Sequence, residues 1–288
     1  MSHLSQINYI RPVDLLMKLK HAIVIHGPGR SGTTMLDNIL SIHQDFYWIS
    51  SYLNKYPKCT ELSILNRLTR IGFLERNLRK NRYFPKPNEA YDFWRSKFSN
   101  FNAGEQVLVD PEEVERCIKC LKEIQTFASG DRFITKFTGA SRANFIDSLF
   151  EDPIVLWIDR EPKAIIMSYF KQNWHYRNES TERNKKTVIE LIDEYSKHLE
   201  DVLDRREHLT KFRLKQLYYE DMVSNPDVFF KDLCLELNLS FDERFERRVR
   251  NWVIRKNTNT QYKSLLTKSE QAYLHERSIP IAKRMGYI

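Results

Sequence analysis

The sequence predicts a single α/β domain, in which a parallel sheet is covered by helices on both of its faces. Short apolar runs typical of buried strands alternate with helical patterns along the 288 residues, and no linker or internal repeat interrupts them. The most distinctive polar motifs directly follow two of these apolar runs. Because ligands of such sheets bind at the carboxyl ends of the strands, we expect the motifs to lie at one edge of the sheet.

The predicted elements follow the chain in strand–helix order. Four strands are expected, at residues 22–26, 132–136, 154–158 and 213–219. Helices are expected at about residues 33–42, 111–127, 142–150, 162–171, 186–206, 226–237 and 267–285. The sequence therefore places a helix after each predicted strand.

The region from about residue 48 to 130 departs from this alternation and is rich in aromatic residues. We interpret it as a largely helical insertion over the ligand edge, because such elements often shape a substrate pocket. A peripheral helical layer without a role in substrate binding is the alternative. Inside the region, Cys117 lies on the apolar face of a capped amphipathic helix pattern. We therefore interpret Cys117-x-x-Cys120 as core thiols rather than as a metal or redox motif.

Composition and charge are typical of a soluble globular protein that binds an anionic ligand or surface. Hydrophobic residues make up 41% and charged residues 29% of the chain, whose net charge is +8. No apolar run approaches the roughly 20 residues that span a bilayer, and residues 1–10 lack the pattern of a signal peptide. The four cysteines fit a reducing compartment. We therefore expect a cytoplasmic protein.

The densest basic stretch covers residues 67–82, where six arginines and lysines, Arg67 and Arg70 among them, stand against the single acid Glu75. Its apolar residues are spaced for one face of a helix, although Gly72 weakens that prediction. A solvated basic face is one interpretation. The other is a surface for an anionic acceptor or for the headgroups of a peripheral membrane contact.

The segment Gly27-Pro-Gly-Arg-Ser-Gly-Thr-Thr34 follows the first predicted strand and enters a helical pattern. This order directs backbone N–H groups and the positive end of a helix dipole at a phosphate. The segment nearly matches the Walker pattern, but Thr33 occupies the place of the lysine and the fixed cation is Arg30. A nucleotide triphosphatase needs that lysine. We therefore interpret the loop as a site for a phosphate outside a Mg²⁺-bound triphosphate.

A second motif follows the strand predicted at residues 154–158. Arg160 stands at the strand end, where its guanidinium can bind a phosphate with two parallel hydrogen bonds. Pro162 then opens a helix, and Ser168 follows about two turns later with a hydroxyl that can join the same ligand.

Together these segments resemble sulfotransferases that use 3′-phosphoadenosine 5′-phosphosulfate (PAPS), most closely the bacterial members. The loop from Gly27 is similar to their 5′-phosphosulfate loop, and Asp159-Arg-Glu-Pro-Lys-Ala-Ile-Ile-Met-Ser168 to their 3′-phosphate motif. Tyr219-Glu-Asp-Met resembles a strand end of the family. Residues 255–267 echo a further phosphate-binding loop, with Asn257 and Thr260 in place of its glycines. The four segments occur in the order of the family.

The resemblance implies a fold like that of P-loop NTPases, PAPS as the cofactor, its product 3′-phosphoadenosine 5′-phosphate (PAP), and no metal. The residues that it implies for cofactor binding are Gly29, Arg30, Ser31, Gly32, Thr33, Thr34, Arg160, Ser168 and Tyr219. Sulfuryl transfer builds negative charge on the leaving nucleotide, and fixed cations can stabilise that charge. Arg30 and Lys136, the latter at a predicted strand end, are the implied catalytic cations. A solvated lysine at a strand terminus is the alternative for Lys136.

A general base should take the proton of the acceptor. Some family members use a glutamate shortly after the first helix, but residues 47–52 contain no carboxylate. Glu89 is our choice, because Pro85-Lys-Pro-Asn-Glu89-Ala-Tyr91 loosely matches a motif of bacterial members. Glu61 and His43 are rivals, and a structural cap is the alternative role of His43. His175 is a candidate for the acceptor site, with aromatic packing as its alternative.

The leading hypothesis is an enzyme that transfers a sulfuryl group from PAPS to a hydroxyl or amine. Its acceptor remains open among carbohydrates, lipids, small phenols and peptides. A P-loop nucleotide kinase or NTPase is the second hypothesis, and Thr33 argues against it. A nucleic-acid-binding protein is disfavoured because no known reader motif is present. A catalytically inactive protein that binds PAP is the remaining alternative.

Overall fold

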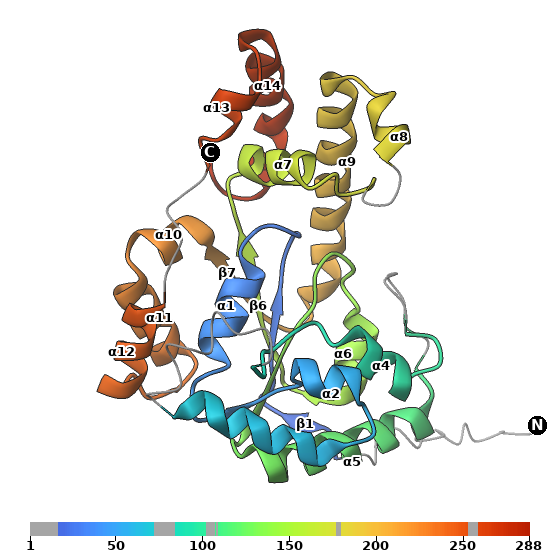
Figure 1. Ribbon diagram of the computed structural model, residues 1–288, viewed down its shortest axis with the longest axis vertical. Helices are drawn as coiled ribbons and strands as arrows, with labels where there is room; N and C mark the ends of the chain where they lie inside the picture. Colours follow the sequence, from blue (N-terminus) through green and yellow to red (C-terminus); the bar gives the residue numbers. More distant parts are fainter. Residues whose placement is uncertain (1–16, 72–83, 102–106, 108, 177–179, 253–258) are drawn as a thin grey trace, which may run out of the picture.

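The computed structural model describes residues 17–71, 84–101, 107, 109–176, 180–252 and 259–288. Its centre is a five-stranded parallel sheet in the order β3-β4-β2-β6-β7 (Figure 1). The strands are β2 (Ile23–His26), β3 (Phe46–Tyr47), β4 (Arg132–Lys136), β6 (Ile154–Asp159) and β7 (Arg213–Tyr218). A separate parallel pair joins β1 (Leu19–Lys20) to β5 (Phe150–Glu151). The predicted α/β fold class is confirmed.

Both faces of the sheet are buried because apolar side chains alternate between them along the central strands. Ile23 and Ile25 of β2 belong to one hydrophobic cluster, and Val24 between them belongs to the other. The helices of the first face are α1 (Thr33–Leu40), α10 (Tyr219–Ser224), α11 (Pro226–Glu236) and α12 (Glu243–Asn251). Those of the second face are α4 (Tyr91–Lys97), α5 (Pro111–Ala128), α6 (Ala143–Leu149), α7 (Pro162–Lys171), α9 (Val188–Arg206) and α14 (Lys268–Arg284).

Five short helical segments complete the described chain: α2 (Ser51–Lys55), η2 (Thr60–Arg70), α8 (Ser180–Asn184), η3 (Glu207–Leu209) and α13 (Tyr262–Leu265). All four predicted strands and all seven predicted helices are present, with ends within two residues of the expected ones. Several of the long helices begin at a residue whose side chain caps the first turn. For example, Asp110 caps α5 by accepting a hydrogen bond from the backbone of Glu112, and Thr187 caps α9 in a capping box.

In its described residues, the region predicted to be a helical insertion contains α2, η2, α4 and α5. Its largest aromatic side chains are core residues, since Trp48, Phe93, Trp94 and Phe98 are at most 2% exposed. The Trp94 ring meets Phe145 of α6 edge to face at 5.3 Å. These four side chains therefore attach the insertion to the domain and do not form an open pocket wall.

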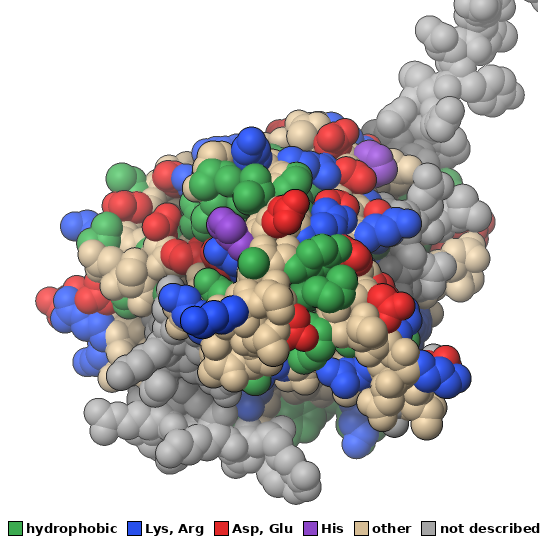
Figure 2. Space-filling model, turned by 90° about the horizontal axis from the view of Figure 1, so that it is seen from above, with side chains coloured by type: hydrophobic (Ala, Val, Ile, Leu, Met, Phe, Trp, Pro, Cys, Tyr) green, Lys and Arg blue, Asp and Glu red, His purple; other side chains and the backbone are tan. Residues whose placement is uncertain are grey.

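Two residues of the basic stretch make hydrogen bonds within the fold. The guanidinium of Arg67 donates to the carbonyl of Thr126, and that of Arg70 donates to the hydroxyl and carbonyl of Ser129, at the end of α5. Residues 72–83, which hold the rest of the stretch, lie outside the described part. On the face seen in Figure 2, Lys and Arg side chains are interspersed with Asp and Glu, so the net positive charge is not gathered in one patch there.

The cysteines divide into one exposed and three buried thiols. Cys117, Cys120 and Cys234 are buried and free, whereas Cys59 is exposed. Burial raises the pKa of the Cys117 and Cys120 thiols. This agrees with the interpretation of the Cys-x-x-Cys pair as core thiols. None of the described helices combines the length and the apolar composition needed to cross a bilayer.

Replacing Trp94 tests whether the insertion and the sheet share one core. The substitution Trp94→Ala should lower the free energy of unfolding by about 3–5 kcal/mol, because it leaves a large cavity between α4 and α6. Urea denaturation followed by circular dichroism measures the effect. Tyr56→Ala is the matched control, since Tyr56 is 48% exposed and its loss should cost less than about 1 kcal/mol. Equal losses would mean that the insertion folds independently of this contact.

Candidate functional site

A pocket of about 600 Å³ opens at the carboxyl ends of the central strands, where the sequence placed the ligand edge. Of the nine residues predicted to bind the cofactor, all except Gly29 and Ser31 line it. The full lining is Arg30, Gly32, Thr33, Thr34, Met35, Asn38, Arg160, Ala164, Met167, Ser168, Lys171, Gln172, Tyr219, Trp252, Asn259, Gln261 and Tyr262. The structure thus brings together motifs that are almost 200 residues apart in the chain.

The loop between β2 and α1 turns through backbone conformations that favour glycine. Gly32 has φ +106°, and a Cβ atom there would lie 2.6 Å from the ring of Tyr219. Gly32 is the N-cap of α1, and no side chain caps that helix end. The backbone N–H of Met35 already donates to the carbonyl of Gly32, whereas those of Thr33 and Thr34 make no backbone hydrogen bond within the described residues and are open to an anion, whose negative charge the helix dipole favours. The hydroxyl of Ser31, buried in the same loop, has no hydrogen-bond partner within the described residues.

His26 holds the beginning of this loop. Its Nδ1 accepts a hydrogen bond from the backbone N–H of Gly27 at 2.9 Å, so the proton resides on Nε2, which donates to the carbonyl of Ala140 at 2.8 Å. The ring stacks on Trp157 of β6. Burial lowers the pKa of His26 to about 4, so the imidazole is neutral at physiological pH.

Arg30 and Arg160 connect the loop to α7. The Nε of Arg30 donates to Oγ of Ser168 at 2.9 Å, and Nη1 of Arg160 donates to the carbonyl oxygen of Arg30 at 3.1 Å. The guanidinium of Arg160 also lies over the ring of Tyr219, 4.4 Å from its centre. Because Lys171 lines the same pocket, three cations surround a cavity sized for a nucleotide.

Glu220 supports Arg160 from behind. Its Oε1 accepts hydrogen bonds from the side chain of Asn259 at 2.5 Å and from the backbone N–H of Glu161 at 3.1 Å. Asn259 in turn accepts a hydrogen bond from Nε of Arg160 at 3.0 Å. The hydroxyl of Tyr287 donates to the other oxygen of Glu220 at 2.6 Å. Asn259 thereby orients the guanidinium, and Tyr287 orients the carboxylate that holds Asn259, although both residues are distant from Arg160 in sequence.

Lys136 and Glu89, two of the three predicted catalytic residues, form an ion pair. Nζ of Lys136 lies 3.6 Å from Oε1 of Glu89 and donates to Oγ1 of Thr34 at 2.9 Å. Thr138 donates to the same carboxylate oxygen at 2.9 Å. Lys136 is 5% exposed, so it is not a solvated lysine at a strand end. The contact with Thr34 attaches this pair to α1, whose first turn lines the pocket.

The rivals for the role of base, His43 and Glu61, and the acceptor-site candidate His175 lie away from Lys136. His43 is buried: its Nε2 bonds to the carbonyl of Ser240 at 2.8 Å, and its ring packs edge to face on Phe245. Glu61 is exposed on η2. His175 bonds to Glu194 of α9 at 2.7 Å and does not line the pocket. Within the described residues, only Glu89 among these candidates contacts Lys136.

Sequence reasoning missed several lining residues. Lys171 stands three residues after Ser168 on α7, and the i, i+3 rule could have placed both on one face of that helix. Asn259 comes from the segment that weakly echoed a phosphate-binding loop, whereas Asn257 of that segment lies outside the described residues. Tyr262 comes from the same segment, whereas Trp252 carries no sequence signal, because its position depends on how α12 packs on α11.

The comparisons with known proteins match sulfotransferases. A model described as the sulfotransferase family matches residues 22–243. Sulfotransferase STF9 from Mycobacterium avium is 17% identical with a TM-score of 0.56, and the match covers 90% of this chain and 76% of that one. The sulfotransferase domain from the curacin biosynthetic pathway is 12% identical with a TM-score of 0.52, covering 92% and 98%. Mouse sulfotransferase SULT7A1, complexed with PAP, is 13% identical with a TM-score of 0.51, covering 92% and 84%.

No curated protein sequence matches the chain. Because the solved structures are at most 17% identical to this chain, their likeness shows a shared fold. The match to the family model shows the family. The fold prediction and the resemblance stated from the motifs are both confirmed by these comparisons.

The buried carboxyl of Asp37, beneath the Lys136 contact, gives stability a testable pH dependence. Burial raises its pKa to about 6, against the attraction of Lys136 and a hydrogen bond from Ser41. At pH 4 the carboxyl is largely protonated in the folded state, and above pH 6 folding must bury a charge that the unfolded chain exposes. The stabilisation present at low pH is therefore lost as the pH rises from about 4 to 6.

The substitution Asp37→Asn removes this titration while keeping a polar partner for Ser41. The difference in unfolding free energy between the variant and the native chain should shift in favour of the variant by up to about 3 kcal/mol from pH 4 to pH 7. Urea denaturation at both pH values measures the difference. Asp131→Asn, at an exposed aspartate, is the control and should show no such trend. A difference independent of pH would show that Asp37 ionises normally.

Proposed function

Because the chain belongs to the sulfotransferase family, we propose that it transfers a sulfuryl group from PAPS to a hydroxyl or amine of an acceptor. The observation that carries this proposal is the pocket of about 600 Å³ in which the loop after β2, Arg160 and Ser168 meet. The similar mouse sulfotransferase SULT7A1 was solved as a complex with PAP, which supports the same nucleotide here.

The residues of the pocket fit a nucleotide with phosphates at both ends. Arg30 and the N-terminus of α1 suit the 5′ end, where the buried hydroxyl of Ser31 is available as a further hydrogen-bond donor. Arg160 and Ser168 suit a 3′-phosphate, and Lys171 adds a third positive charge. The aromatic ring of Tyr219 makes this pocket partly apolar, as nucleotide sites usually are.

Bound PAPS supplies an activated sulfuryl group. The residues of this chain bind and orient PAPS and neutralise the negative charge that develops on it. Arg30 and the loop N–H groups stabilise negative charge at the 5′ end, and Lys136 adds a fixed cation held by Thr34. These cations can stabilise the charge that develops, and the proposal invokes no metal. A kinase function would need the lysine that Thr33 replaces.

Glu89 is the proposed general base. Its carboxylate is positioned by the hydrogen bond from Thr138, by Lys136 and by a hydrogen bond with Tyr91, and it would take the proton of the acceptor. Glu89 lies in the segment of residues 84–90, and the bridge between Ser50 and Pro87 fixes this segment against the start of α2. We therefore propose that the acceptor enters between this segment and the end of β4.

Incubation of cell extracts with the protein and isotopically labelled PAPS, followed by mass spectrometry, tests the reaction and finds the acceptor. Labelled sulfate should appear on a product that is absent without the protein. Binding of PAP without any labelled product would identify a catalytically inactive binding protein instead.

Arg160 should govern recognition of the 3′-phosphate. The substitution Arg160→Ala should lower the affinity for PAP about 10- to 100-fold, since one charge-assisted contact is worth roughly 1.5–3 kcal/mol. The affinity for adenosine 5′-phosphate, which lacks that phosphate, should change much less. Calorimetry in excess EDTA measures both affinities. Lys122→Ala, at an exposed position of α5, is the control for net charge. Equal affinity of the native protein for the two nucleotides would contradict a 3′-phosphate site.

Replacement of Glu89 should affect chemistry more than binding. In Glu89→Gln the amide keeps the shape of the side chain but cannot take a proton, so kcat should fall roughly 10²- to 10⁴-fold. The PAP affinity should stay within about threefold, because Glu89 does not line the nucleotide pocket. Glu61→Gln is the matched control and should leave kcat nearly unchanged. A nearly normal kcat in Glu89→Gln would assign proton removal to another group.

A further inference from the structure

Strand β7 forms an open edge of the central sheet. It pairs with β6 along its whole length, from Arg213 to Tyr218, and is the last strand in the sheet order. In the described part of the chain, no backbone hydrogen bond joins its outer side to another segment. Alternate backbone N–H and C=O groups of such an edge point away from the sheet and can pair with another chain.

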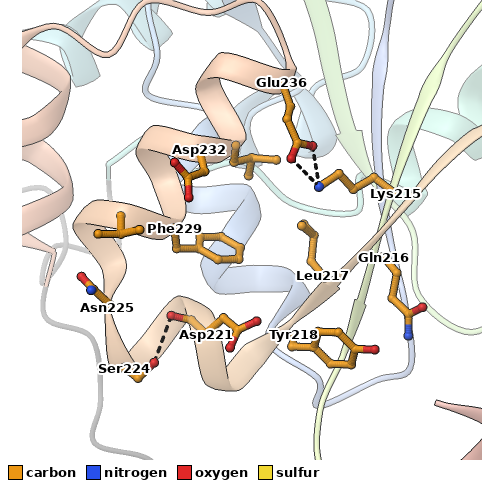
Figure 3. Close-up of a pocket in the computed structure, with 12 residues that line it drawn as sticks. Lys215, Gln216, Leu217, Tyr218, Asp221, Ser224, Asn225, Phe229, Asp232 and Glu236 are labelled. Carbon is orange, nitrogen blue, oxygen red and sulfur yellow. Dashed lines mark hydrogen bonds and ion pairs between the residues drawn. The ribbon is translucent and has the colours of Figure 1, made fainter. Parts of the chain in front are cut away.

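A groove of about 410 Å³ lies between this strand and α11 (Figure 3). Lys215 and Leu217, whose side chains point to one face of β7, line the groove together with Gln216 and Tyr218 from the other face. Because these four residues are consecutive, the backbone of β7 forms part of the groove wall, beside the open edge of the strand.

The opposite wall is one stripe of α11. The N-cap Asn225 lines the groove together with Val228, Phe229, Asp232, Leu233 and Glu236, and the steps of three or four residues from 225 to 228 or 229, to 232 or 233 and to 236 place them along one side of the helix. This stripe is about 16 Å long at 1.5 Å per residue. About five residues of an extended chain, at 3.3 Å each, would fill that length.

The groove is apolar at its centre and acidic around it. Leu217 and Phe229 form the floor, and Val228 is 50% exposed beside them. The carboxylates of Asp221, Asp232 and Glu236 stand against the single ammonium of Lys215, which is itself bound to Glu236 at 2.6 Å.

This charge is opposite to that of the whole chain, whose net charge is +8. Edge strands often carry a lysine that repels other strands, but the ammonium of Lys215 is bound across the groove and does not guard the edge.

We propose that the groove between β7 and α11 binds an extended segment of another protein that contains lysine or arginine. The segment adds to β7 as a sixth strand of the sheet, and its backbone pairs with the open edge. An apolar side chain packs on Phe229 and Leu217, and a basic side chain meets Asp221 and Asp232. The groove shares no lining residue with the nucleotide pocket, so the proposal is independent of the sulfuryl transfer.

A phage library of random dodecapeptides, panned against the full chain, tests the proposal. Enriched sequences should lack proline at their centre and contain at least one lysine or arginine next to an apolar residue. The best peptide, synthesised and titrated by calorimetry, should bind with a stoichiometry of one. Hydrogen exchange followed by mass spectrometry should then show slower exchange in the peptic fragment that contains Arg213–Tyr218.

The double substitution Asp221→Asn with Asp232→Asn should weaken this peptide about two- to thirtyfold, the range expected for losing two exposed ion pairs. Glu115→Gln with Glu123→Gln removes the same charge from exposed positions of α5 and should leave binding unchanged. Failure to enrich any sequence, acidic enriched sequences, or unchanged exchange in β7 would overturn the proposal. Self-association of the chain that the double substitution abolishes would also overturn it, because the occupant would be a second copy.

Discussion

The close approach of the loop after β2 to the ends of β6 and β7 is the constraint on which the candidate site depends. A side chain at Gly27 would place its Cβ 2.5 Å from the carbonyl oxygen of Ile158, and one at Gly32 would collide with the ring of Tyr219. The absence of both Cβ atoms lets the loop reach the adjacent strand ends. The same ring then supports Arg160, so one steric requirement positions the helix N-terminus and the buried cation together.

The fold was largely predictable because its central strands are buried on both faces and therefore appear as short apolar runs. The runs that became β2 and β6 are fully buried over nearly their whole length. Strand β3 was missed because two residues, Phe46 and Tyr47, are too short to show a period. Helix α12 was missed because charged residues dominate it, although Asp242 provides a good N-cap.

The predictable residues of the candidate site follow a strand directly or lie on the helix after it, as Arg160 and Ser168 do. Arg160 was found in this way because a strand end fixes its position. The contact of Glu89 with Lys136 depends on the path of the insertion, which no local pattern in the sequence specifies. The role of Glu220 behind Arg160 was also out of reach, since it arises from tertiary contacts with Asn259 and Tyr287. Local sequence thus predicts the anchors of the site and leaves their support undetermined.

The single exposed thiol has a practical consequence for spectroscopy. Cys59 stands immediately before η2 in the insertion, whereas the other three cysteines are buried. A maleimide fluorophore added to the folded native chain should therefore attach at one position, without removal of any cysteine. A dye at that position would report on the insertion, and energy transfer from it to a fluorescent nucleotide would follow the segment that carries Glu89 as ligands arrive.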